Sequence, residues 1–99
     1  MKMKYLLSSD NGYHWNTSIM FDSIEDAVIY WANEQIEEYS SDWVKVIVIS
    51  IERPIKNIDS HIEVKVQAID EDNYIYNKVV YISEMIDIKP KNKYNVTAL

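Results

Sequence analysis

The side chains best suited to proton transfer near neutral pH are two histidines, His14 and His61. A hydrolytic or metal site would need a nucleophile or further ligands that converge on one of them. His14 is close to Asp10, but a turn is enough to explain that spacing, and neither histidine has an HxH or HExxH spacing. Cysteine, which could act as a thiolate nucleophile or a zinc ligand, is absent. We therefore predict no catalytic residue, no metal site and no cofactor, and a protein that is not an enzyme. An enzyme that pairs a histidine with a nearby carboxylate is the weakest alternative.

Acidic residues form two groups that could bind cations or basic partners. The first, Asp70-Glu71-Asp72, could offer oxygen ligands to calcium. It lacks EF-hand spacing, and a short hairpin tip cannot surround an ion, so we predict a solvated turn. The second group lies on a predicted helix without lysine or arginine and comprises Asp26, Glu34, Glu37 and Glu38, with Glu25 at its edge. Such a row could imitate the phosphates of a nucleic acid toward a DNA-binding protein, or could simply be a solvated face.

Charge and aromatic residues limit the kinds of partner. The chain has 16 acidic and 10 basic residues and a formal net charge of −6. Because a phosphate backbone attracts lysine and arginine, binding of double-stranded nucleic acid is not expected. Tyr74 and Tyr76 share a face of the last predicted strand, and would form an exposed platform if that face lies opposite the helix. Such a platform could stack the bases of a single strand. Only Lys65 and Lys78 lie nearby, however, so a protein contact fits better.

A polar turn near the N-terminus has a specific pattern. The segment Ser8-Ser9-Asp10-Asn11-Gly12-Tyr13-His14-Trp15 matches Ser-x-Asp-x-Gly-x-x-Trp and resembles the Asp-box hairpin of sialidase-type propellers. The resemblance implies structural roles, in which Ser8 and Asp10 tie down the turn, Gly12 takes its tight corner and Trp15 packs beneath it. The match covers only this hairpin and occurs once, and a propeller needs several four-stranded blades, which 99 residues cannot supply. It therefore supports a hairpin and gives no support for glycosidase activity.

Apolar periodicity, turn residues and capping residues predict the elements that position these side chains. Two strands come first, over Met3–Ser9 and Tyr13–Phe21, followed by a helix that is capped by Asp22 or Ser23 and ends near Glu38–Ser40. Three more strands follow, over Trp43–Ile51, Ile62–Ala68 and Tyr74–Met85. A loop over Ile55–Ser60 separates the first two of these three strands, and a loose tail begins at Lys89. The apolar face of the helix is predicted to carry Ile24, Ala27, Val28, Trp31, Ala32 and Tyr39, with Gln35 among them. We predict a single α+β domain over residues 1–88 and a tail over 89–99. The domain has the order ββαβββ, an antiparallel sheet of about five strands with one helix packed on one face.

The run Trp43–Ile51 is dense in β-branched residues, which favour an extended backbone. Strict alternation along a strand would turn Trp43, Ile47, Ile49 and Ile51 to one face and Val44, Val46 and Val48 to the other. Both faces are then apolar, which predicts a central strand covered on both sides. One helix covers only one face, so the other face needs a protein partner, a second copy, or the chain's own loop and tail.

These observations together predict a small acidic protein-binding module. The N-terminal residues lack the layout of a signal peptide and no apolar run could span a membrane, so we expect a cytoplasmic protein. Frequent Ile, Asn, Tyr and Lys, whose codons are AT-rich, suggest the AT-rich genome of a phage or a low-GC bacterium. The surplus apolar and aromatic surface, the acidic balance and the lack of a catalytic constellation favour a phage-type regulator or inhibitor of a host protein, with a homodimer or a hetero-complex as its assembly. A single-stranded nucleic-acid-binding module and a structural subunit of a larger assembly are the alternatives. The predicted partner-binding residues are Asp26, Tyr30, Glu34, Glu37, Glu38, Val44, Val46, Val48, Tyr74 and Tyr76.

Overall fold

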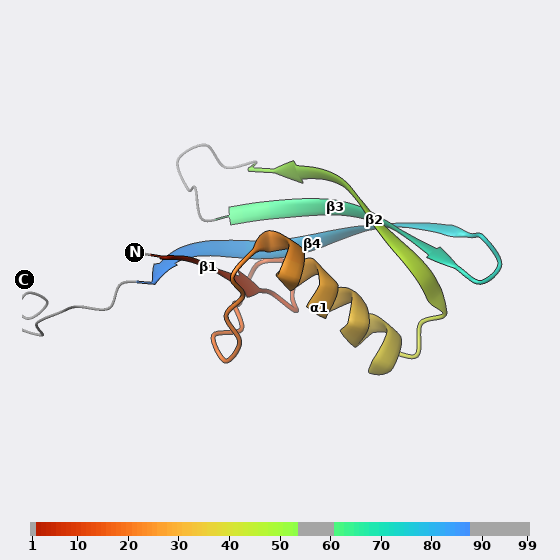
Figure 1. Cartoon of the computed structure of the whole chain (residues 1–99), viewed down its shortest axis with the longest axis horizontal. Helices are drawn as coiled ribbons and strands as arrows, with labels where there is room; N and C mark the ends of the chain where they lie inside the picture. Colours follow the sequence, from red (N-terminus) through yellow and green to blue (C-terminus); the bar gives the residue numbers. More distant parts are fainter. Residues whose placement is uncertain (1, 54–60, 88–99) are drawn as a thin grey trace, which may run out of the picture.

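The computed structural model describes residues 2–53 and 61–87 (Figure 1). Its elements are, in chain order, β1 (Lys2–Leu7), α1 (Ile24–Glu37), β2 (Trp43–Glu52), β3 (His61–Asp70) and β4 (Ile75–Asp87). The α+β class, with one helix and an antiparallel sheet, is confirmed. In the described part the sheet has four strands rather than about five, and the order is βαβββ rather than ββαβββ. The loop predicted over Ile55–Ser60 and the tail predicted over 89–99 lie outside the described residues.

The second predicted strand, Tyr13–Phe21, is wrong, because this segment is a loop. It pairs with β1 through an isolated bridge in which Phe21 and Tyr5 exchange two backbone hydrogen bonds, each of 2.9 Å. Two backbone amides of this segment bind side chains instead of a strand: Asp10 Oδ1 accepts from the N–H of His14 at 2.7 Å, and Asn16 Oδ1 accepts from the N–H of Ser18 at 2.9 Å. Local hydrogen bonds from side chains to the backbone therefore take the place of the strand pairing that the apolar alternation predicts.

The strands lie in the order β1-β4-β3-β2, and each neighbouring pair is antiparallel. The prediction that Trp43–Ile51 forms the central strand is wrong, because this run lies in β2 at one edge of the sheet (Figure 1). The central strands are β3 and β4. Alternate residues of β3 are all buried, namely Ile62, Val64, Val66 and Ala68. An apolar run therefore predicted a strand correctly without predicting its place in the sheet.

The core lies between α1 and one face of the sheet and consists mainly of Ala27, Val28, Ile62, Val64, Val66, Val80 and Ile82. Ser23 caps α1 as predicted, since its Oγ accepts from the N–H of Asp26 at 3.0 Å. The helix packs on β1 and β4 (Figure 1). It reaches β2 through Trp31, whose ring centre lies 5.5 Å from that of Trp43 near the start of the strand. This placement leaves the rest of β2 less covered than the middle of the sheet.

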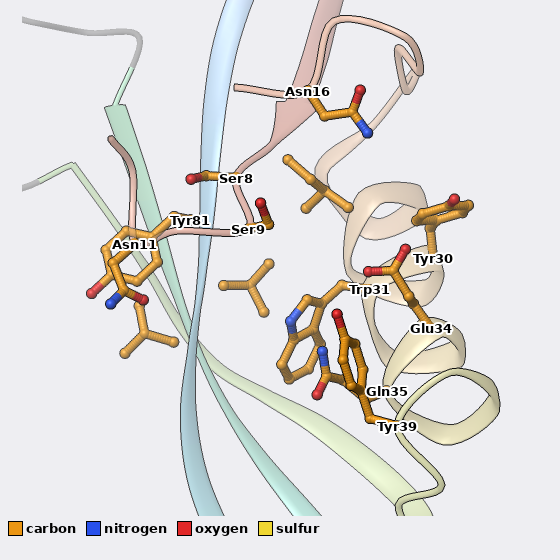
Figure 2. A pocket seen from close by; sticks show the side chains of 13 residues that line it. Ser8, Ser9, Asn11, Asn16, Tyr30, Trp31, Glu34, Gln35, Tyr39 and Tyr81 are labelled. Atoms are coloured by element: carbon orange, nitrogen blue, oxygen red, sulfur yellow. The ribbon is translucent and has the colours of Figure 1, made fainter. Parts of the chain in front are cut away.

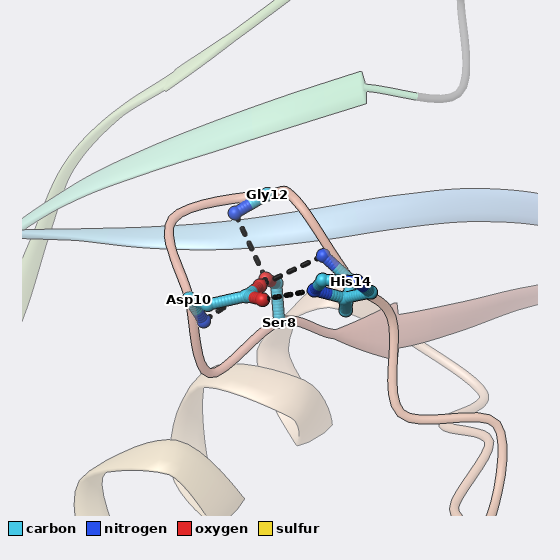
Figure 3. Close-up of polar contacts among 4 residues, drawn as sticks. All are labelled: Ser8, Asp10, Gly12 and His14. Carbon is cyan, nitrogen blue, oxygen red and sulfur yellow. Dashed lines mark hydrogen bonds and ion pairs between the residues drawn. The ribbon is translucent and has the colours of Figure 1, made fainter.

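The turn that resembles an Asp box forms the hydrogen bonds that the resemblance implies (Figure 3), but the hairpin that it supported does not form, because no strand directly follows the turn in the part of the chain that the structure describes. Ser8 Oγ accepts from the N–H of Gly12 at 2.8 Å, and Asp10 Oδ1 accepts from the N–H of His14 at 2.7 Å. Gly12 has φ of +91°, and a Cβ atom there would lie 3.1 Å from Cε1 of His61. A side chain would therefore be both strained and crowded. The turn packs on the sheet at His61, which points away from the helix side of β3, so it covers part of the second face.

Within the described residues, no helix combines the length and the apolar character needed to cross a membrane.

Candidate protein-binding surfaces

An apolar groove separates α1 from the edge strand β2. Its volume is about 450 Å³, and among the described residues that line it only Glu25 is charged. The apolar groove is lined by Ile24, Val28, Ile29 and Ala32 of α1 and by Val46, Val48 and Ile51 of β2. Val46 is half-buried against the core, whereas Val48, Ile51 and Ile29 are exposed. The groove therefore presents apolar walls from two elements to the solvent.

The register between β2 and β3 explains why these three β2 residues share the groove. Val46 lies opposite Ala68, Val48 opposite Val66 and Ile51 opposite Val64, and each of these β3 residues is buried on the helix side. Residues directly opposite each other in a sheet point to the same face. The side chains of Val46, Val48 and Ile51 therefore point toward the side on which α1 packs, at the edge that α1 does not cover.

Two register shifts in β2 correct the predicted division of its faces. The shifts lie between Trp43 and Lys45 and between Val48 and Ser50. Each inserts a residue and thereby moves the following side chains to the other face. The prediction that Trp43 and Ile51 face away from Val46 and Val48 is wrong for this reason. Val44, a predicted partner-binding residue, is exposed at the first shift.

The inserted residue at the second shift, Ile49, belongs to the opposite face of the sheet. It borders a shallow hollow together with Lys65, Gln67, Asn77 and Val79, residues of β3 and β4 that alternate with the buried ones. Ile49 and Ile51 are 55% and 53% exposed. The strand thus presents two isoleucines of nearly equal exposure on opposite faces, which makes Ile49 a natural control for the groove.

The helix contributes two exposed isoleucines that were not among the predicted site residues. Ile29 lines the apolar groove, and Ile36, seven positions later, lies on the same side of α1. Both fall on the flank of the helix rather than on its core face. The sequence does contain a sign of these two residues, an apolar pair at a spacing of seven. This spacing indicates an exposed apolar surface only when the position of β2, across a groove from that flank of α1, is known.

A second, polar cleft lies on the other side of α1, where β1 ends (Figure 2). Its volume is about 320 Å³. The polar cleft is lined by Leu7, Ser8, Ser9, Asn11 and Asn16, by Tyr30, Trp31, Glu34, Gln35 and Tyr39, and by Val79, Val80 and Tyr81. Among these described lining residues only Glu34 is charged. The polar cleft therefore combines aromatic rings and amides around one carboxylate.

The structure divides the predicted acidic and aromatic helix residues between surfaces. Glu34 and Tyr30 line the polar cleft, and the ring of Tyr30 also packs against Phe21 with centres 5.2 Å apart. Asp26, Glu37 and Glu38 are exposed, and Glu37 and Glu38 border a small hollow of the helix surface that Tyr30, Asn33 and Glu34 also line. Of the predicted acidic group, only Glu25, at its edge, lines the same groove as Val46 and Val48.

Tyr74 and Tyr76 do not form an aromatic platform on the face of the sheet opposite the helix, the arrangement that a base-stacking site would need. Tyr76 lies opposite Ala68, so it points to the helix side of the sheet, and Tyr74 precedes β4. The Tyr76 hydroxyl donates to Asp70 Oδ2 at 2.9 Å, while Asp70 Oδ1 accepts from the N–H groups of Asp72 and Tyr74 at 2.9 and 3.0 Å. Asp70 is only 3% exposed, so the predicted solvated turn is wrong for this residue, although Glu71 and Asp72 are exposed. The Asp70 carboxylate therefore stabilises the β3–β4 hairpin through these three hydrogen bonds.

These contacts also shift the pKa values of Asp70 and Tyr76 in the hairpin. Burial by itself would raise the pKa of the Asp70 carboxyl, but the hydrogen bonds from Tyr74, Tyr76 and Asp72 outweigh it and hold this pKa below its usual value. The hydrogen bond to Asp70 in turn raises the pKa of the Tyr76 hydroxyl. Both shifts keep Asp70 charged and Tyr76 protonated, which is the state that the hydrogen bond requires.

The two histidines lie in separate structural contacts. The His14 ring hydrogen-bonds to Asp10, and this contact, together with the backbone N–H of His14, lowers the pKa of Asp10 to about 2. His61 Nε2 lies 3.2 Å from Glu63 Oε2, and its ring makes edge contacts with Trp15 and Tyr81. In residues 2–53 and 61–87, no three or more His, Asp or Glu side chains gather in a way that could hold a metal ion.

No family model matches this chain, and comparisons with curated proteins and with solved structures find no match either.

Proposed function

We propose that this chain is a non-enzymatic protein-binding module that seats an apolar surface of its partner in the groove between α1 and β2. One observation carries the proposal: Ile29, Val48 and Ile51 stand exposed around one apolar groove on the core side of the sheet. Filling such a groove removes its walls from water, which is worth about 25 cal/mol per Å² of apolar area. An exposed apolar patch that a protein maintains is most simply explained by binding.

The shape of β2 supports docking of side chains rather than extension of the sheet. Two register shifts interrupt the pairing of β2, and Lys45–Val48 is the regularly paired stretch between them. Bulges at an edge oppose the addition of another strand, whether from a second copy or from a partner. We therefore expect the partner to present apolar side chains from a helix or a packed surface.

The role that we propose is that of a regulator or inhibitor of a host protein, of the phage type and acting in the cytoplasm. The net charge of −6 and an α1 without lysine or arginine favour a basic partner, because opposite charges steer the encounter. The acidic Asp26, exposed on the outer side of α1, would then face basic residues around the apolar contact.

Site-specific photocrosslinking tests the proposal with a matched pair of positions. A photoreactive phenylalanine analogue replaces Ile51 in one protein and Ile49 in the other, and each is produced at low level in the native host and irradiated. We expect a defined protein adduct from position 51 and none from position 49, since the two residues have nearly equal exposure but point to opposite faces. Equal adducts from both positions, or no adduct from position 51, would show that the apolar groove is not a binding surface. Light scattering of the purified chain shows whether it forms a dimer. If it does, an adduct of twice the mass of the chain is a second copy.

A further inference from the structure

We infer that the polar cleft binds a lysine or arginine side chain carried by an extended segment of the partner, which lies along the side of β4 before Ile82, where no described strand pairs. The inference rests on the proposed function, since it supplies the chemistry of a protein partner at a second surface. It concerns different residues from the apolar groove, because the cleft shown in Figure 2 shares no lining residue with that groove.

The lining of the cleft suits a cation. Glu34 supplies its one charged group among the described residues, with the rings of Tyr30, Trp31 and Tyr39 around it. Aromatic faces attract an ammonium or guanidinium group through their quadrupole, and a carboxylate adds a charge-assisted hydrogen bond. A neutral ligand would use the rings but would leave the carboxylate without a counter-charge. The side-chain amides of Asn16 and Gln35 complete the polar wall.

The edge of β4 next to the cleft can accept an extended backbone. Pairing with β1 ends at Ile82, which lies opposite Leu7. The N–H of Ser8 donates to the carbonyl of Tyr81 at 3.2 Å, so the backbone groups of Tyr81 face the β1 side of the strand. Alternate residues face the same way, which directs the N–H and C=O groups of Asn77 and Ile75 to that side as well.

In the part of the chain that the structure describes, no strand pairs with this side of β4 before Ile82. Val79 lines the polar cleft, and Asn77 lies roughly 7 Å further along the strand. A peptide paired with Asn77 would therefore have a neighbouring residue within reach of Glu34. Strand addition gives affinity through the backbone, while a pocket for one side chain gives specificity.

Titration with short peptides, followed through backbone and indole N–H signals by NMR, tests the inference. The probe is an acetylated, amidated peptide with one arginine flanked by threonine and valine. A second peptide has citrulline in place of arginine, which removes the charge at nearly constant shape. A third has N-methylated amides, which cannot pair with a strand edge. The protein is used as the wild type, as Glu34→Gln, and as Glu37→Gln, an outward control on the same helix that does not line the cleft.

We expect saturable shifts at Trp31, Asn77 and Val79 with the arginine peptide. Citrulline or Glu34→Gln should weaken binding about tenfold, the usual effect of losing a charged hydrogen bond, whereas Glu37→Gln should not. N-methylation should weaken it as well. Equal binding of the citrulline peptide, an equal effect of both glutamate variants, shifts confined to the apolar groove, or no saturable shift at millimolar peptide would each overturn the inference. The outcome is separate from that of crosslinking at Ile51, because either surface can fail while the other binds.

Discussion

Replacing Ile51 by lysine should lower the stability of the folded chain only slightly, because the side chain is already 53% exposed. Full burial of an isoleucine is worth about 1.5–3 kcal/mol, so roughly half of that, about 1 kcal/mol, is at stake in Ile51→Lys. The methylene stem of lysine keeps part of the contact with the groove, which reduces the loss further. Ile49→Lys, at 55% exposure on the opposite face, should cost a similar amount. Each change should lower the melting temperature by about 4–8 °C or less.

Urea unfolding followed by tryptophan fluorescence measures both variants against the wild type. The dependence of the unfolding free energy on urea should stay constant, so that midpoints compare directly. A loss of about 3 kcal/mol or more for Ile51→Lys, with Ile49→Lys nearly unchanged, would match the loss from a fully buried position. That result would mean that the groove is filled within the folded chain, and it would refute the view of the groove as an open binding surface.

Three further changes test other parts of the structure. Gly12→Ala should destabilise the fold by about 2 kcal/mol in thermal unfolding, because its positive φ and its closeness to His61 disfavour any side chain; an unchanged melting temperature would contradict this turn geometry. Ile82→Ala should cost about 2–5 kcal/mol in urea unfolding, since the side chain is fully buried, and a loss below 1 kcal/mol would place it outside the core. The pKa of Asp10 is about 2 in the folded chain, below that of an unfolded aspartate, so its stabilising contribution is present above about pH 4 and is lost as the pH falls toward 2. Asp10→Asn should remove this part of the acid dependence of unfolding, and an unaltered acid profile would argue against the contact with His14.

Features set by neighbours in sequence could be predicted. The cap of α1 follows from Ser23 and the amide three residues later, and the buried side of β3 follows from its regular alternation. The turn at Ser8 and Gly12 likewise forms through hydrogen bonds within a few residues. The loop over Tyr13–Phe21 was missed because side-chain to backbone hydrogen bonds compete with strand pairing there, and apolar alternation does not reveal that competition.

The candidate surfaces were predicted only in part. Val46 and Val48 are predicted as partner-binding residues and both line the apolar groove, whereas Ile29 and Ile51, which also line it, are not among the predicted partner-binding residues. The sequence places Glu34 in an acidic row, and in the structure it borders a hollow with Glu37 and Glu38 but also lies among the aromatic rings of the polar cleft. These differences arise because a surface is formed by elements that are far apart in the sequence, and the packing of the helix decides which flanks remain open.

By itself the sequence determined that β2 is a strand and that it is apolar throughout, since β-branched residues favour an extended backbone wherever the strand lies. Only the tertiary structure decided that β2 stands at the edge, with α1 packed over β1 and β4. The register shift at Ile49 then turned Ile51 to the same face as Val48. Register is set by pairing with a distant strand, and a shift of one residue exchanges the two faces, so no local pattern could have shown that these residues form one groove.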